Sequence, residues 1–213
     1  MASLLIYSGG LDSTTMLYEY KDSIVLAVSF DYGSKHNTRE IACAAENCRL
    51  LGIRHMIIPL GFIGQYFKSD LLLSGGEIPE GSYADENMRS TVVPFRNGIM
   101  LAVAAGLAES YELDAIMLAN HSGDHAIYPD CRPAFIDAFA AAVQAGTYNG
   151  VKLLSPYCHM SKRDIALRGK ALGIDYSKTY SCYKGGEKHC GKCGTCTERK
   201  EALEGFDPTE YEG

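Results

Sequence analysis

The amino-acid sequence predicts an α/β fold: an open, mostly parallel five-stranded sheet with helices on both faces. Short apolar runs alternate with longer runs of helical spacing, and this alternation is typical of βαβ units. The apolar runs resemble strands that helices cover on both sides. Beyond about residue 176 the pattern changes to Gly, Lys and Cys. We therefore divide the chain into an α/β domain, 1–175, and a small C-terminal segment, 176–213.

Each strand is predicted from a short stretch rich in Leu, Ile, Val or Phe, and each helix from helical spacing of apolar residues or frequent alanine. The predicted strands are 4–7, 24–30, 55–60, 115–119 and 151–154, and the predicted helices are 12–20, 39–51, 97–112, 133–145 and 162–172. Gly52 is the expected C-cap of the second helix and Ser161 the N-cap of the last. The stretch 61–94 contains several glycines and prolines and is predicted as a long surface loop, a functional lid or a disordered segment.

The composition is that of a globular protein. Of 213 residues, 46% are hydrophobic and 22% are charged, which excludes disordered and collagen-like classes. The net charge of −6 disfavours binding to duplex nucleic acid. No apolar run is long enough for a membrane span, and the N-terminus has no basic flank, so we expect no signal peptide, no nucleic-acid or membrane partner, and a cytoplasmic protein. Half of the 20 Lys and Arg residues lie between 160 and 200. Such a cluster is expected either as a solvated face or as a surface that faces an anion.

The segment 8–14, SGGLDST, joins the first predicted strand to the first helix. Its glycines let the backbone approach a ligand closely, and backbone N–H groups at the start of a helix attract anions. Ser8, Ser13 and Thr14 add hydroxyl donors. No lysine follows the glycines and the GxGxxG spacing is absent, which excludes the Walker-type and dinucleotide-binding loops. The segment therefore predicts a phosphate site of another kind.

Four of the eight cysteines crowd into the C-terminal segment. In a reducing cytosol such a cluster indicates a metal rather than disulfides. Four thiolates at this spacing suit a closed tetrahedral Zn²⁺ site, which would fold a segment with little core of its own. An iron–sulfur cluster and unmetallated thiols stay open as alternatives, and His189 could replace one ligand. Cys43 and Cys48 are expected to be core thiols. The predicted ligands are Cys182, Cys190, Cys193 and Cys196.

Polar residues follow the second and fourth predicted strands and precede the third helix, at 31–36, 120–133 and 92–97. In an open α/β sheet the carboxyl ends of the strands face one crevice, where ligands bind. This shared position makes these residues candidates for a binding site. His121 and His125 are nevertheless expected at the surface rather than as ligands.

The other candidates each have a structural alternative. Arg96 could cap a helix, and Asp130 could pair with Arg132. Lys162 could begin a helix or reach a phosphate. Cys131 is expected to pack in the core, with a nucleophilic role as the alternative.

The string SGGLDST resembles the pyrophosphate-binding loop of the N-type ATP pyrophosphatases, also called PP-loop enzymes. Members of that superfamily cut ATP between its α and β phosphates and adenylate a carbonyl or carboxyl oxygen, which a nitrogen or sulfur nucleophile then displaces. Further motifs follow in order: DYG at 31–33, VPFRN at 93–97, YPDCRP at 128–133, and SCY and CGKCGTC within 181–196. Together they resemble the 7-cyano-7-deazaguanine synthase (QueC) family over essentially the whole chain.

The resemblance implies that 7-carboxy-7-deazaguanine, ammonia and two ATP are converted to a nitrile on the route to queuosine. The carboxylate would be adenylated and displaced by ammonia to give an amide, and a second adenylation would let the amide lose its oxygen as AMP. Mg²⁺ and a homodimer are implied as well. Ala134 stands where the family pattern has an acidic residue, and Tyr180 where it usually has tryptophan. The first departure bears on a substrate contact and the second on packing.

The resemblance also carries roles onto two sets of residues in this sequence. The first set would bind ATP: Ser8, Gly9, Gly10, Leu11, Asp12, Ser13, Thr14, Thr15, Met16, Leu17 and Tyr18. The second set would form the catalytic crevice, with Asp12 organising the metal and phosphates: Asp12, Arg96, Asp124, Asp130, Arg132 and Lys162.

Two alternative functions stay open. A tRNA sulfur transferase would use the same loop with a persulfide on Cys131 or Cys158. A zinc-ribbon module would bind nucleic acid through the basic C-terminal segment. Residue 2 is alanine, so an N-terminal cysteine glutaminase is not expected, and the chain length leaves no room for an added amidotransferase domain. We therefore expect free ammonia as the nitrogen source.

Overall fold

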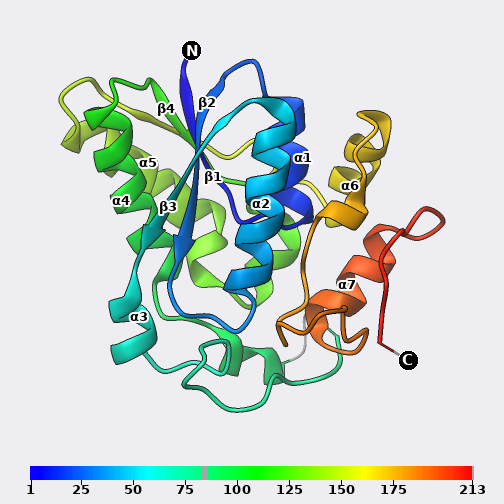
Figure 1. The fold of residues 1–213 in the computed structure, drawn as a ribbon. Coiled ribbons are helices and arrows are strands. Elements are labelled where there is room, and N and C mark those ends of the chain that lie inside the picture. Colours follow the sequence, from blue (N-terminus) through cyan, green and yellow to red (C-terminus); the bar gives the residue numbers. More distant parts are fainter. Residues whose placement is uncertain (83–85, 213) are drawn as a thin grey trace.

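The computed structural model describes residues 1–82 and 86–212, and a five-stranded sheet lies at its centre (Figure 1). The strands are β1 (Ser3–Ile6), β2 (Ile24–Asp31), β3 (Arg54–Pro59), β4 (Ala115–Met117) and β5 (Lys152–Leu154). Their order is β3-β2-β1-β4-β5, and every neighbouring pair is parallel. The chain first adds β2 and β3 on one side of β1 and then β4 and β5 on the other, so the direction of strand order switches between β1 and β4.

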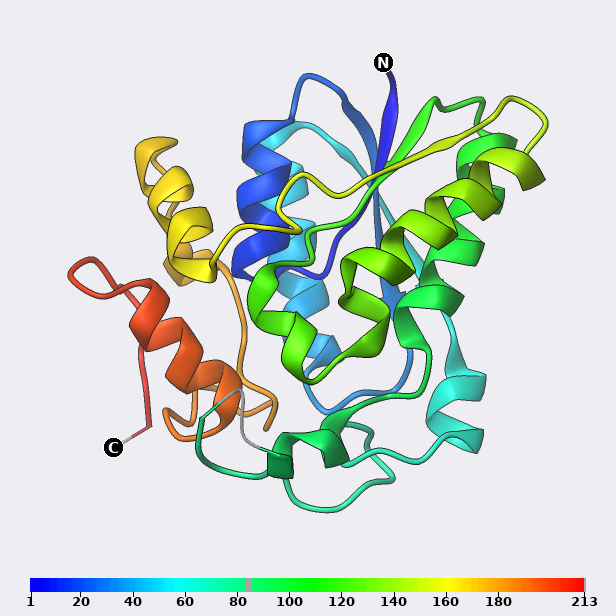
Figure 2. The same ribbon diagram turned by 180° about the vertical axis from the view of Figure 1, so that it is seen from behind.

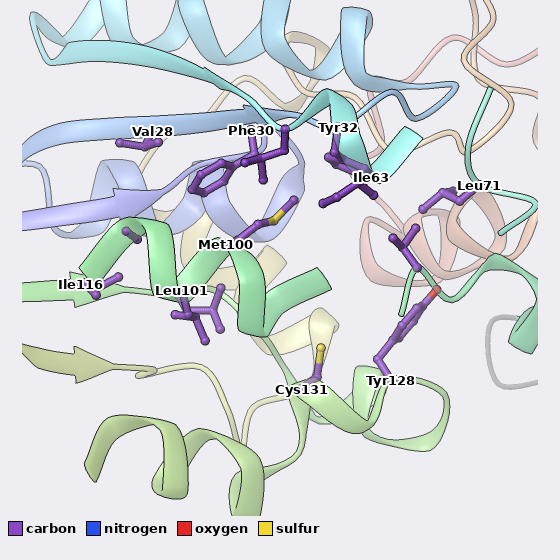
Figure 3. Close-up of a cluster of buried hydrophobic side chains, with 14 of the residues drawn as sticks. Val28, Phe30, Tyr32, Ile63, Leu71, Met100, Leu101, Ile116, Tyr128 and Cys131 are labelled. Carbon is purple, nitrogen blue, oxygen red and sulfur yellow. The ribbon is translucent and has the colours of Figure 1, made fainter. Parts of the chain in front are cut away.

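Helices cover both faces of this sheet, as predicted (Figures 1 and 2). One face carries α1 (Leu11–Glu19), α2 (Asn37–Leu51) and α6 (Lys162–Ala171), and the other carries α4 (Arg96–Ser110) and α5 (Pro133–Gly146). Successive strand residues point to opposite faces. Leu4 therefore packs in the core with α4, where Val28, Phe30 and Leu101 fill the space (Figure 3), and Leu5 packs in the second core with α1 and α6.

All ten predicted elements are present, and their ends differ from the predicted ones by at most two residues. Gly52 ends α2 in the left-handed conformation, with φ of 67°. The side chain of Ser161 accepts a hydrogen bond from the backbone N–H of Asp164 at the start of α6. Both predicted helix caps are thus confirmed.

The stretch 61–94 differs from the predicted surface loop. It contains α3 (Gly61–Tyr66) and the 3₁₀ helix η1 (Glu86–Thr91). Leu71 and Met88 are fully buried and belong to the core beside α4. Because the stretch contains many glycines and prolines, its pattern did not indicate that some of its apolar side chains pack into the core of the domain. Residues 83–85 of the predicted loop lie outside the described residues.

The C-terminal segment is more regular than predicted, because it contains the 3₁₀ helix η4 (Tyr176–Lys178) and the helix α7 (Gly194–Ala202). Its centre is polar: Arg199 is fully buried, and its guanidinium donates to the carbonyl of Tyr176 at 2.7 Å and to Ser181 Oγ at 3.0 Å. Within residues 1–82 and 86–212, none of the helices combines the length and apolar character needed to cross a bilayer.

Candidate active site

A cavity of about 210 Å³ lies at the carboxyl ends of β1 and β4. It is lined by the loop after β1, the end of β2, the starts of α2 and α4, the loop after β4, the start of α6 and the C-terminal segment. This is where the strand order switches, the usual binding place in an open α/β sheet. Motifs that are far apart in the sequence therefore meet in one cavity.

The loop before α1 leaves hydrogen-bond donors open at the helix start. Gly10 provides no side-chain cap for α1, so the first N–H groups of the helix are available to an anion. Ser8 Oγ accepts from the N–H of Gly10 at 3.1 Å and lies 3.0 Å from Ser13 Oγ. Gly9 has φ of +91°, and a Cβ there would overlap the carbonyl oxygen of Glu40. The loop can thus lie against α2 only with glycine at this position.

The predicted ATP-binding residues divide into two groups in the structure. One group lines the cavity, and the other is packed behind it within α1 and its surroundings. The lining group is Ser8, Gly10, Leu11, Asp12 and Ser13; the remaining residues are Gly9, Thr14, Thr15, Met16, Leu17 and Tyr18. Thr14, for example, hydrogen-bonds to the hydroxyl of Tyr7 at 3.0 Å.

A cluster of charged side chains lies directly beside this loop. The ammonium of Lys162, at the start of α6, is 3.2 Å from Asp12 Oδ2 and 2.8 Å from Glu198 Oε2 on α7. His121 Nε2 lies 3.5 Å from Asp124 Oδ1, 3.8 Å from Asp12 Oδ2 and 3.9 Å from Glu198 Oε1. Three carboxylates therefore surround one lysine and one histidine.

The electrostatics of the cluster keep Lys162 positively charged. Burial alone would lower the pKa of Lys162, but the carboxylates of Asp12, Glu198 and Asp124 outweigh burial and raise it. Burial raises the pKa of Glu198, although Lys162 and His121 oppose that shift. Asp12 Oδ1 is buried and has no hydrogen-bond partner within the described part of the chain. Oxygen ligands of this kind suit Mg²⁺.

Arg96 forms another wall of the cavity, at the first position of α4. Its Nη1 donates to the hydroxyl of Tyr32 at 3.0 Å. Burial alone would lower the pKa of Arg96, but the interactions with Tyr32, Tyr183 and other neighbours outweigh burial and raise it. Among residues 1–82 and 86–212, no carboxylate lies within ion-pair distance of its guanidinium. The group can therefore receive a carboxylate or phosphate from a ligand.

The YPDCRP segment supports this wall from behind. It includes the 3₁₀ helix η3 (Pro129–Cys131). Asp130 Oδ2 accepts from the N–H of Asn97 at 2.8 Å and so caps α4. Arg132 instead donates to the carbonyl of His125 at 2.9 Å, is exposed and does not line the cavity. The alternative of an Asp130–Arg132 pair is thus wrong, because each side chain has another partner.

Cys131 packs as expected. Its thiol is buried, accepts a hydrogen bond from Asn97 Nδ2 at 3.1 Å, and has a pKa raised by burial. A raised pKa keeps the thiol protonated, which disfavours a nucleophilic role.

The sequence-based prediction missed or misplaced two residues of the cavity, His121 and Glu40, and one residue of the charged cluster beside it, Glu198. His121, expected at the surface, is only 2% exposed; it caps the 3₁₀ helix η2 (Ser122–Ala126), which turns its ring inward. Glu198 lies on α7, a helix that the glycine-rich pattern concealed. Glu40 lies on a predicted helix, but nothing in the local pattern indicates which side chain of that helix faces the loop after β1.

The four C-terminal cysteines form one buried group whose Sγ atoms all lie within 4.8 Å of one another. A tetrahedral ion with bonds of about 2.3 Å places its sulfur ligands about 3.8 Å apart, and the Cys190 and Cys196 sulfurs are 3.9 Å apart. A cluster of several irons would hold the sulfurs farther apart, so the geometry fits a single ion. His189 Nε2 accepts from the N–H of Ser181 at 3.1 Å and is not part of the group.

Comparisons with known proteins find relatives over almost the whole chain. Residues 2–207 match the family described as queuosine biosynthesis protein QueC. A 7-cyano-7-deazaguanine synthase of Porphyromonas gingivalis is 65% identical over 99% of this chain and 97% of its own. One from Methanoregula boonei is 48% identical over 100% of both chains. The solved structure of NMN synthetase from Francisella tularensis shares the fold, with a TM-score of 0.50 and 12% sequence identity. The match covers 87% of this chain and 68% of the synthetase chain.

Proposed function

The chain belongs to the family of queuosine biosynthesis protein QueC, and we propose that both adenylation steps of nitrile formation take place in its one cavity. As a member of this family it is an ATP-dependent 7-cyano-7-deazaguanine synthase. The proposed reaction consumes 7-carboxy-7-deazaguanine, ammonia and two ATP. It releases the nitrile, two AMP and two pyrophosphates, because each carboxylate oxygen leaves with one adenylyl group.

The loop after β1 is suited to hold the departing pyrophosphate. Its hydroxyls and the open N–H groups of α1 are fixed, neutral donors, and such donors stabilise charge that develops on phosphate oxygens. Lys162 adds a positive charge at the edge of the loop. When the phosphates bind, they can take over the interaction that Lys162 now makes with Asp12 and Glu198.

Asp12 is the residue that we propose for binding Mg²⁺. Its Oδ1 atom, buried and without a partner in the described residues, offers the oxygen ligand that Mg²⁺ prefers. The ion would neutralise charge on the phosphate oxygens.

Arg96 is the proposed receptor for the carboxylate of the substrate. A guanidinium can bind a carboxylate through two parallel hydrogen bonds, which would orient one carboxylate oxygen for attack on the α-phosphorus. Tyr32 and Tyr183 line the same cavity, and their flat rings can pack against a planar heterocycle. The observation behind the proposal is that one cavity holds both the loop after β1 and the Arg96 guanidinium, which has no carboxylate partner among the described residues.

For the four-cysteine group we propose a structural zinc ion. Cys193 immediately precedes α7 and Cys196 lies in its first turn, so the ion would fix the start of the helix that carries Glu198. Free ammonia is the proposed nitrogen source. The sulfur-transfer alternative would need a reactive thiol, and the raised pKa of Cys131 argues against one at that position.

Product analysis tests the proposed function. With ATP, Mg²⁺, ammonium and 7-carboxy-7-deazaguanine, we expect one nitrile, two AMP and two pyrophosphates per turnover, measured by chromatography and mass spectrometry. Glutamine in place of ammonium is expected to give no nitrile. Formation of ADP and orthophosphate instead of AMP and pyrophosphate would exclude adenylation.

A further inference from the structure

Glu40 is a buried acid in the cavity that the proposed function leaves without a role. It lies in the first turn of α2, its side chain is 15% exposed, and it lines the cavity. Its Oε1 atom is 3.7 Å from the position that a Cβ on Gly10 would occupy. The carboxyl group therefore faces the loop that we propose for pyrophosphate.

The surroundings of Glu40 hold its carboxyl group without a full counter-charge. Among the described residues, the one basic side chain within 4.0 Å of its carboxyl group is His36, whose Nε2 lies 3.4 Å from Glu40 Oε2. Arg96 and Lys162 act on Glu40 from a greater distance. Burial, opposed by these two cations, raises the pKa of Glu40 to about 8. When ionised, this carboxylate is a stronger base than an ordinary one.

His36 completes an uncharged pair with Glu40. Burial, reinforced by Arg96, lowers the pKa of His36 to about 3, so the imidazole is neutral at neutral pH. Its Nδ1 atom is buried and has no hydrogen-bond partner within residues 1–82 and 86–212. A neutral imidazole can accept a hydrogen bond from a protonated Glu40 through Nε2. The pair can therefore hold a proton without placing a net charge in the cavity.

The proposed reaction requires nitrogen to lose three protons, one in the first stage, which forms the amide, and two in the second, which forms the nitrile. In the first, the lone pair of ammonia forms the new C–N bond, the C–O bond to the adenylyl group breaks with its electrons leaving on AMP, and the nitrogen must lose a proton. In the second, the nitrogen lone pair of the adenylated amide becomes the second C–N bond and one proton leaves nitrogen. The electrons of the remaining N–H bond then become the third C–N bond while the C–O bond breaks and AMP leaves, so a second proton is lost. Lys162 and Arg96 are already protonated, and the carboxylates of Asp12, Asp124 and Glu198 lie in one cluster with Lys162 and His121. Glu40 is a cavity carboxyl group outside that cluster.

We propose that Glu40 is the catalytic base that takes these protons from nitrogen, with His36 as the positioning residue that accepts a hydrogen bond from its protonated form. This inference rests on the proposed function and adds a proton acceptor to it. It predicts that adenylation and nitrogen transfer can be separated by a change at one residue.

The variant Glu40→Gln tests the inference. Glutamine keeps the shape of the side chain, and the loss of a buried ionisable group should not destabilise the fold. Adenylation is followed as exchange of labelled pyrophosphate into ATP in the presence of the carboxylate substrate and without ammonium. We expect this exchange to stay within about threefold of the unchanged enzyme, while nitrile formation falls by about 10²-fold or more and acid quenching traps the acyl-adenylate.

Glu46→Gln is the matched control, because Glu46 is on the same helix and pairs with Arg49 at the surface. This variant should change neither the rate of pyrophosphate exchange nor the rate of nitrile formation. Nitrile formation by Glu40→Gln at a near-normal rate would overturn the inference. So would a parallel loss of exchange and nitrile formation, since Glu40 would then only support the loop. Failure of the proposed function itself is distinguishable, because the unchanged enzyme would show no substrate-dependent exchange.

Discussion

Replacing Lys162 by methionine is expected to lower kcat/KM for ATP by about 10²- to 10³-fold, because a fixed positive charge beside the phosphates is lost. The ammonium lies 3.2 Å from Asp12 and 2.8 Å from Glu198, and the side chain is 12% exposed. A charge so shielded from water acts strongly on a bound phosphate. Methionine keeps the length and apolar stem of lysine, so the substitution tests the charge. Steady-state kinetics at saturating carboxylate substrate and ammonium measures the effect.

The same substitution leaves the carboxylates of Asp12 and Glu198 without their counter-charge, and we expect it to lower the free energy of unfolding by about 3 kcal/mol. The double variant Lys162→Met with Glu198→Gln removes part of the repulsion. It should recover stability in urea unfolding without recovering kcat/KM. Lys170→Met, at an exposed position of the same helix, is the control. It should change the free energy of unfolding and kcat/KM only slightly. Recovery of activity together with stability in the double variant would show that Lys162 acts only through folding.

Replacing Cys193 by serine is expected to remove the bound zinc and to lower kcat/KM by more than about 100-fold, because a structural zinc site supplies folding energy to its segment. The thiolates do not line the cavity. Their influence would pass through α7, which begins directly after Cys193 and carries Glu198 to Lys162. Thr195, also on α7, lines the cavity itself. Loss of the ion would therefore shift α7 and, with it, the contact between Glu198 and Lys162, although the ion itself would lie outside the cavity.

Three measurements check this expectation: zinc per chain by elemental analysis, the melting temperature, and kcat/KM. The control is Cys43→Ser, which changes a half-buried thiol outside the group of four and should retain zinc and most of the activity. A zinc-free Cys193→Ser protein with an unchanged melting temperature and full activity would contradict a structural role for the metal.

The α/β fold could be predicted because its sequence pattern is local. Strand and helix differ in the spacing of their apolar residues, and neighbours such as Leu4 and Leu5 pack into separate cores on opposite faces of the sheet. Capping residues such as Gly52 and Ser161 fixed the helix ends. The packing of the stretch 61–94 against the domain could not be predicted, because Leu71 and Met88 reach the core from an irregular backbone that has no periodic pattern.

The candidate site was predictable only where a residue lies at a strand end or a helix start. Asp12, Arg96 and Lys162 all satisfy that rule and meet in the cavity. His121 also follows a strand, but its inward orientation depends on a cap that forms with Asp124 and on contacts from α7. Glu198 reaches the charged cluster and Glu40 reaches the cavity through the packing of whole helices. No spacing within the sequence encodes that long-range placement.

Isotope labelling of the substrate carboxylate shows where each of its oxygens goes in the proposed reaction. In the proposed mechanism each carboxylate oxygen attacks an α-phosphorus while the loop after β1 retains pyrophosphate. With 7-carboxy-7-deazaguanine labelled with ¹⁸O at both carboxylate oxygens, each of the two AMP molecules should carry one ¹⁸O, and the pyrophosphate should carry none. Label in orthophosphate or pyrophosphate, with unlabelled AMP, would contradict the account.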